Sequence, residues 1–153
     1  MASLVHGLKF FKKRNLVKIL APLLVETFQE NWSRKAFDLI LPVPLHAKRK
    51  RDRGYNQSEL LAKILAARIG IPVDAKILTR IRATVSQVGL SNLERRANVR
   101  KAFSCLDPER VAGLRILLID DVMTTGATAA SASKALLKSG ARRVSVLTLA
   151  RTE

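Results

Sequence analysis

Residues 120–128 combine acidic residues, hydroxyl residues and a glycine in an order that suits a phosphorylated sugar. Two carboxylates, Asp120 and Asp121, precede a short segment with three hydroxyl groups and one glycine: Thr124, Thr125, Gly126, Ala127 and Thr128. Backbone N–H groups and hydroxyls of such a segment can surround a phosphate, and glycine lets the backbone approach it closely. Adjacent carboxylates would repel a bare phosphate, but they can accept hydrogen bonds from the vicinal hydroxyls of a sugar. The pattern therefore predicts a ribose 5-phosphate site.

Each half of this segment also has a simpler interpretation. An Asp-Asp pair after a strand can be an exposed strand end, and Thr-Thr-Gly can be an ordinary turn between a strand and a helix. We favour the binding site because the two halves are joined and directly follow an unbroken aliphatic run at residues 116–119. A short motif gains specificity from a structural context of this kind.

The neighbouring residues predict the strand and the helix that would position the segment. Residues 116–119 are uniformly aliphatic, as in a parallel strand that is buried on both faces. Good helix formers fill residues 129–138, Gly140 follows where a left-handed cap belongs, and residues 144–149 resume a strand. Ligands of open α/β sheets bind where strands end, and a helix N-terminus favours anions. This strand–helix–strand unit therefore offers its connecting loop to a phosphate.

An earlier part of the chain repeats this order. Residues 37–43 form an apolar run that predicts a second strand. Asn56, with Glu59 three positions later, has the spacing of a helix N-terminal cap, and Gly70 ends the apolar pattern of that helix. The alternation of strands and helices predicts an α/β fold with a mainly parallel, twisted sheet flanked by helices.

The remaining segments are less regular. A helix is expected over residues 16–28, kinked or broken by Pro22, and a short strand is expected over residues 76–81. Residues 82–102 have little periodicity apart from a short basic helix near their centre, which is typical of a lid or a binding loop. With 48% apolar residues, we predict a single domain over residues 1–153 rather than a disordered tail or a fibre.

Short motifs spread along nearly the whole chain add to this interpretation. The strand and loop over residues 117–128 resemble the signature of the type I phosphoribosyltransferases. Further motifs resemble the ComF family of phosphoribosyltransferase-like proteins, named for natural competence, and lie at residues 7–10, 41–46, 53–57, 87–90, 94–96 and 98–99. Members of that family commonly carry an N-terminal zinc ribbon with paired Cys-x-x-Cys motifs, whereas this chain has one cysteine, Cys105. We therefore expect no zinc ribbon and no zinc.

The resemblance implies a substrate and a reaction. The substrate would be 5-phosphoribosyl-1-diphosphate with Mg²⁺, and a nitrogen nucleophile would displace pyrophosphate at the anomeric carbon. Asp120 and Asp121 would orient the ribose directly or through metal-bound water, and residues 124–128 would anchor its 5-phosphate. Residues 82–102 would form the flexible hood. The pyrophosphate loop, whose simpler interpretation is a turn, would consist of Pro42, Val43, Pro44, Leu45 and His46.

Basic and amide side chains near these motifs are further candidates. Arg53 adjoins a motif glycine and is expected to point inward, whereas the basic run at residues 48–51 has a solvated face as its commoner interpretation. Asn56 and Gln57 suit contact with substrate, although Asn56 suits a helix cap equally well. A lid can bring cations to a departing pyrophosphate. The candidates within the hood segment are Gln87, Arg95 and Arg96.

The charge of the chain leaves a second function open. Lysine and arginine number 28 against 12 acidic residues, and this formal net charge of +16 indicates a polyanionic partner. Nucleic acid, an acidic membrane surface and a phosphorylated metabolite all qualify. The alternative is therefore a non-catalytic diphosphate-binding or single-stranded-DNA-binding accessory protein of DNA uptake. Aromatic residues make up only 5% of the chain, which counts against single-strand binding because such proteins stack bases on aromatic rings.

Location and assembly follow from simpler features. No apolar run reaches the roughly 18–20 residues of a membrane span, and no secretory signal is visible, so we expect a cytoplasmic protein. Proteins of the competence machinery are further candidate partners, and a homo-oligomer stays open.

Overall fold

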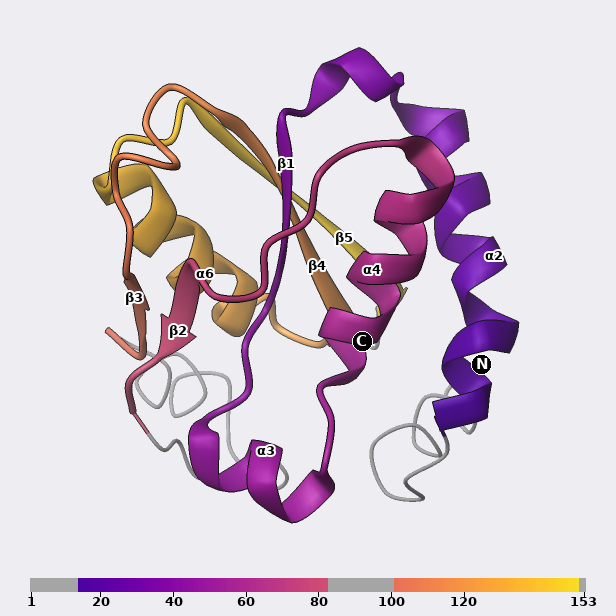
Figure 1. The fold of residues 1–153 in the computed structure, drawn as a ribbon, viewed down its shortest axis with the longest axis horizontal. Coiled ribbons are helices and arrows are strands. Elements are labelled where there is room, and N and C mark those ends of the chain that lie inside the picture. Colours follow the sequence, from indigo (N-terminus) through magenta and orange to yellow (C-terminus); the bar gives the residue numbers. More distant parts are fainter. Residues whose placement is uncertain (1–13, 83–100, 152–153) are drawn as a thin grey trace.

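The sheet at the centre of the fold has three parallel strands. The computed structural model describes residues 14–82 and 101–151. Ile119 lies in the middle strand of the sheet, with Pro42 opposite it on one side and Leu147 on the other. The prediction of a mainly parallel α/β sheet is thereby confirmed. The strands pair in this order (Figure 1): β1 (Leu39–Pro42), β4 (Arg115–Met123) and β5 (Arg143–Arg151).

Helices cover both faces of this sheet (Figure 1). α2 (Arg14–Asn31) and α4 (Gln57–Ile69) pack against each other and against one face, and α6 (Ala127–Lys138) packs on the other. Helix α6 begins at Ala127, two residues before the expected start at residue 129. The expected left-handed caps are present, because Gly70 has φ +71° and Gly140 has φ +93°.

The residues of β4 alternate between two hydrophobic cores. Leu117 and Ile119 join the core beneath α2 and α4, whereas Ile116 and Leu118 join the core beneath α6. All four side chains are fully buried. This confirms the predicted strand with two buried faces. Because both faces of β4 are packed, the position of the residues at its carboxyl end is also determined.

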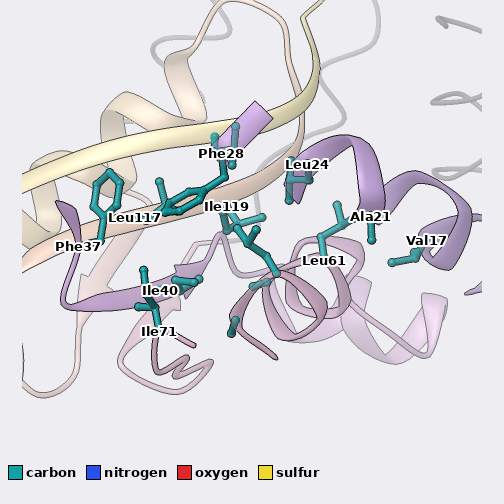
Figure 2. Packing of buried hydrophobic residues seen from close by; sticks show 14 of the residues in the cluster. Val17, Ala21, Leu24, Phe28, Phe37, Ile40, Leu61, Ile71, Leu117 and Ile119 are labelled. Carbon is teal, nitrogen blue, oxygen red and sulfur yellow. The ribbon is translucent and has the colours of Figure 1, made fainter. Parts of the chain in front are cut away.

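Helix α2 is continuous through its proline. The helix extends from Arg14 to Asn31 and includes Pro22, so no break occurs there. Leu24 and Phe28, which follow the proline, are fully buried against Leu61, Leu117 and Ile119 in the first core (Figure 2). Burial of side chains on both sides of the proline, Leu20 before it and Leu24 and Phe28 after it, offsets the one hydrogen bond that it removes.

Two short strands and two short helices complete the described fold. β2 (Leu78–Arg80) is shorter than the strand expected over residues 76–81, and it pairs antiparallel with β3 (Phe103–Cys105). A 3₁₀ helix η1 (Arg34–Ala36) precedes β1, and α3 (Ala47–Arg53) follows it. Most of the predicted hood, residues 83–100, lies outside the described residues. Within the two described stretches, no helix is long and apolar enough to cross a membrane.

Candidate functional site

Asp120 and Asp121 lie within strand β4, near its carboxyl end, rather than after it, because β4 extends to Met123. Asp120 is half-buried, and Asp121 is 8% exposed. The backbone N–H of Asp121 donates to Asp120 Oδ1 at 3.0 Å, and the N–H of Val122 donates to Asp121 Oδ1 at 2.8 Å. These bonds to the local backbone fix both carboxylates, so the expectation of an exposed strand end does not describe the pair.

A serine from helix α4 supports the acid pair. The Ser58 hydroxyl donates to Asp120 Oδ1 at 3.1 Å, although 62 positions separate the two residues. Ser58 is itself buried in the first turn of α4. The N-terminus of α4 therefore meets the carboxyl end of β4. This role of Ser58 could not be predicted, because a serine in a first helical turn gives no local sign of a distant partner.

The predicted phosphate loop forms the turn between β4 and α6. Gly126 has φ +73° and stands at the N-cap of α6, a conformation that favours glycine. The Ala127 N–H donates weakly to Thr125 Oγ1 at 3.4 Å. Residues 124–128 are all half-buried, so the turn is open to solvent and not sealed beneath packed side chains. The first turn of a twelve-residue helix faces this loop and suits an anion.

The predicted pyrophosphate loop lies directly beside the acid pair. β1 ends at Pro42, and the Val43 N–H donates to the Ile119 carbonyl of β4 at 2.8 Å. Asn56 holds the loop from the other side, since its Nδ2 donates to the Val43 carbonyl at 3.0 Å. The parallel register of β1 and β4 thus brings residues 42–46 and Asp120 to one end of the sheet.

Asn56 acts as a helix cap in this structure. Its Oδ1 accepts a hydrogen bond from the Ser58 N–H at 3.1 Å, and its side chain is buried. Both ends of the amide are engaged with the protein, one with the first turn of α4 and one with the loop after β1. Gln57 is also buried, in the first turn of the same helix.

The basic run forms helix α3 beside this loop (Figure 1). His46 caps the helix, because its Nδ1 accepts from the Lys48 N–H at 3.3 Å, and Gly54 ends it with φ +80°. Lys50 pairs with Glu59 of α4 at 3.2 Å, and Glu59 also pairs with Lys63 at 2.8 Å. These pairs lower the pKa of Glu59, the Lys63 contact being the largest cause, and they tie α3 to α4.

Arg80 is a further cation near this site, and nothing in the sequence around it indicated such a position. It ends strand β2, where the predicted hood begins, and it is 9% exposed. Its guanidinium carbon lies 5.4 Å from the centre of the Phe103 ring. Burial lowers the pKa of Arg80, the positive charge of Arg49 lowers it further, and the negative charge of Asp120 opposes both. Arg80 therefore lies within electrostatic reach of the acid pair and of helix α3.

The remaining predicted site residues cannot be placed. The backbone of Arg53 ends α3, but its side chain is outside the described part of the structure. The hood candidates outside the described residues are Gln87, Arg95 and Arg96.

Asp120 and Asp121 have the chemistry of magnesium ligands. Mg²⁺ takes oxygen ligands and is held by one or two carboxylates together with substrate phosphates. Asp120 and Asp121 supply two such carboxylates beside the phosphate loop. In residues 14–82 and 101–151 there is no group of three or more His, Cys, Asp or Glu residues that could hold a metal. Asp120 and Asp121 could therefore serve as two of the oxygen ligands of such an ion.

Comparison with known proteins establishes the family. Residues 56–153 match the family model described as phosphoribosyl transferase domain. The chain is 39% identical to the DNA utilization protein YhgH of Salmonella typhimurium, over 99% of this chain and 67% of that protein. It is 38% identical to Competence protein F of Haemophilus influenzae, over 94% of this chain and 62% of that protein. The chain belongs to the ComF family.

Solved structures agree on the fold of this ComF-family chain. The glutamine phosphoribosylpyrophosphate amidotransferase from B. subtilis has a TM-score of 0.59 at 23% identity, covering 88% of this chain and 26% of the other. The adenine phosphoribosyltransferase from Thermoanaerobacter pseudethanolicus has a TM-score of 0.57 at 16% identity, covering 92% and 71%. The ComF-family chain therefore has the type I phosphoribosyltransferase fold.

Proposed function

We propose that this protein binds 5-phosphoribosyl-1-diphosphate with Mg²⁺ and transfers the phosphoribosyl group to a nitrogen nucleophile, releasing pyrophosphate. One observation carries the proposal. The backbone-anchored pair Asp120, which is half-buried, and Asp121, which is buried, lies near the end of β4, two residues before an open loop of hydroxyls and N–H groups at the start of α6. Carboxylates for a diol therefore adjoin donors for a phosphate, as a ribose 5-phosphate requires.

Different residues of the site would contact different parts of the substrate. Residues 124–128 would donate hydrogen bonds to the 5-phosphate, and Asp120 and Asp121 would accept hydrogen bonds from the ribose hydroxyls. The loop at residues 42–46, which adjoins Asp120, and the guanidinium of Arg80, on which the charge of Asp120 acts, would face the diphosphate. Asp120 and Asp121 would help to hold Mg²⁺, which would supply positive charge to neutralise part of the diphosphate.

The reaction needs positioning and charge stabilisation rather than a covalent intermediate. The bond from the anomeric carbon to the diphosphate oxygen breaks as the bond to the nitrogen nucleophile forms, and pyrophosphate leaves with the electron pair. Arg80 would stabilise the charge that develops on this leaving group. The names of the relatives, DNA utilization protein and competence protein F, lead us to propose that the reaction serves the use of imported DNA.

Ligand-induced stabilisation tests the proposal. At 100 times its dissociation constant, a ligand adds about 2.7 kcal/mol to the free energy of unfolding, which raises Tm by roughly 5–10 °C for a domain of this size. We expect this shift with 5-phosphoribosyl-1-diphosphate and Mg²⁺. The double variant Asp120→Asn with Asp121→Asn should lose most of it. Asp107→Asn, the same chemical change on the loop after β3, is the matched control and should keep it.

Arg80→Met separates the leaving-group role from ribose binding. Methionine keeps the apolar contact with Phe103 but removes the charge. We expect weaker binding of pyrophosphate with Mg²⁺ and little change in the binding of ribose 5-phosphate, both measured by calorimetry. Equal loss of both ligands, or loss of neither, would contradict the assigned role of Arg80.

A second function, single-strand binding, has one observation in its favour. Helix α3 exposes Lys48, Lys50 and Arg51 at the same end of the sheet as the candidate site. If these residues contact nucleic acid, the affinity for a single-stranded oligonucleotide should fall steeply with salt. Charge reversal at Arg49 and Arg51 should then reduce the slope of log affinity against log salt concentration. An unchanged slope excludes α3 as the contact.

A further inference from the structure

A cavity lies at the amino end of the sheet, opposite the candidate site. It has a volume of about 530 Å³ and lies between η1, the beginnings of β1 and β4, and the turn after α4. The candidate site lies at the other ends of the same strands, next to α3 (Figure 1). Cavities that bind small organic ligands have volumes of roughly 300–1,000 Å³. The proposed phosphoribosyl transfer makes no use of this cavity.

The charge of this amino-end pocket is positive. Three cationic side chains line it, from Arg34, Lys35 and Arg115, against one carboxylate, Asp38. Arg115 neutralises that carboxylate with two hydrogen bonds, from Nε at 2.9 Å and Nη2 at 2.6 Å, and these lower the pKa of Asp38 to about 2. The charge of Arg142 also acts on Asp38. Arg34 and Lys35 therefore leave an excess of positive charge that suits an anion.

Arg34 is held in position before any ligand arrives. Its Nε and Nη2 donate to the carbonyl of Gly70 at 3.0 and 2.7 Å, across 36 positions of the sequence. Gly70 suits this contact, because a Cβ there would lie only 3.2 Å from Arg34 Nε. A guanidinium has five N–H donors, so others are left for a ligand, and its planar fork matches the oxygens of a phosphate.

The rest of the lining is apolar. Phe37, Ile71 and Pro72 contribute the apolar side chains of the pocket. Phe37 contacts Trp32, whose ring meets it edge-on with centroids 5.5 Å apart. Phe37 and Ile71 are each 4% exposed and show only their edges to the pocket, whereas Pro72 is exposed. A planar group on an anion would therefore cover chiefly Pro72 and the edges of the other two side chains, which a small inorganic anion would leave in contact with water.

We propose that the amino-end pocket binds an organic phosphate, with Arg34 and Lys35 on the phosphate and the wall of Phe37, Ile71 and Pro72 against its planar part. A nucleotide has this chemistry, either free or within a single strand of nucleic acid. The site is separate from the acid pair, so it stands or falls independently of the proposed phosphoribosyl transfer.

AMP is the probe we choose, and its binding can be followed by tryptophan fluorescence and by NMR. Trp32 is the single tryptophan of the chain, so its fluorescence reports on the Phe37 wall. The amide resonance of Gly70 reports on this pocket, and that of Gly126 reports on the phosphate loop. We expect saturable changes at Trp32 and Gly70. These changes should persist in the double variant Asp120→Asn with Asp121→Asn.

Charge variants identify the pocket. Lys35→Glu should weaken AMP binding by about tenfold or more, since a hydrogen bond to a charged group is lost and a repulsion is added. Lys134→Glu, an exposed position on α6, makes the same change in net charge and should leave the affinity unaltered. Both positions are exposed, so neither change threatens folding.

Three outcomes would overturn the proposal: no saturable change at Gly70, equal weakening by both charge variants, or inorganic phosphate binding as tightly as AMP. The first outcome would show that AMP does not bind in this pocket. The second would show that binding depends only on the net charge of the protein, and the third would show that the apolar side chains contribute nothing to affinity. An oligothymidylate that binds at Gly70 more tightly than AMP supports the proposal and identifies a nucleic acid strand as the source of the phosphate.

Discussion

Asn56 joins the two halves of the candidate site, and its removal should damage both. Its Oδ1 accepts from the first turn of α4, where Ser58 contacts Asp120, and its Nδ2 donates to the Val43 carbonyl in the loop after β1. The side chain is 5% exposed, so water cannot readily replace either bond. Asn56→Ala removes the helix cap and leaves a carbonyl in a buried region without its donor.

The expected loss can be estimated from these two bonds. Replacing an N-cap residue by alanine costs about 1 kcal/mol, and leaving a buried acceptor unsatisfied costs about 1–3 kcal/mol. The free energy of unfolding should therefore fall by about 2–4 kcal/mol, and Tm by roughly 5–15 °C. Asn56→Asp keeps an oxygen for the cap but loses the donor, so it should show the second part of the loss.

Thermal and urea unfolding of both variants measure these quantities, with Asn31→Ala as the matched control. Asn31 makes an exposed side-chain bond to the carbonyl of Thr27, so its loss should cost less than about 0.5 kcal/mol. If Asn56→Asp is as stable as the unchanged protein, the bond to Val43 contributes nothing. If Asn56→Ala resembles Asn31→Ala, the reasoning about both bonds is refuted.

Three further predictions concern the site, the amino end of the sheet and the core. Ser58→Ala removes the hydroxyl that Asp120 accepts, so the Tm shift caused by the diphosphate with Mg²⁺ should shrink; an unchanged shift would show that the hydroxyl is dispensable. Asp38 has its pKa lowered to about 2 from 3.8, so its stabilising effect is complete above pH 4 and is lost as the pH falls toward 2; Tm measured against pH should show less of this loss in Asp38→Asn, and identical profiles would exclude the ion pair as a source of stability. Leu117→Ala should cost about 2–5 kcal/mol in urea unfolding because the side chain is fully buried, whereas Leu137→Ala, 50% exposed, should cost less than about 0.5 kcal/mol.

Elements with a strong local signal could be predicted from the sequence. The aliphatic run of β4 is buried on both faces, and the glycines after α4 and α6 adopt left-handed conformations, as expected. Asn56 caps its helix, as one of its two interpretations proposed. These features depend on a few consecutive residues, because strand burial, caps and turns are set largely by nearby side chains.

Features that depend on distant partners could not be predicted. Arg80 looks like one arginine among many, and only the pairing of β2 with β3 buries it beside Phe103. Ser58 acquires its role when α4 docks against the end of β4. The contact of Arg34 with Gly70 joins residues 36 positions apart. In each case tertiary packing, which no local pattern encodes, creates the interaction.

A crystal structure with 5-phosphoribosyl-1-diphosphate and Mg²⁺ tests the central proposal most directly. We expect the 5-phosphate at residues 124–128, the ribose hydroxyls on Asp120 and Asp121, and the diphosphate between the loop at residues 42–46 and Arg80. A ligand bound elsewhere, or carboxylates turned away from the sugar, would contradict the account.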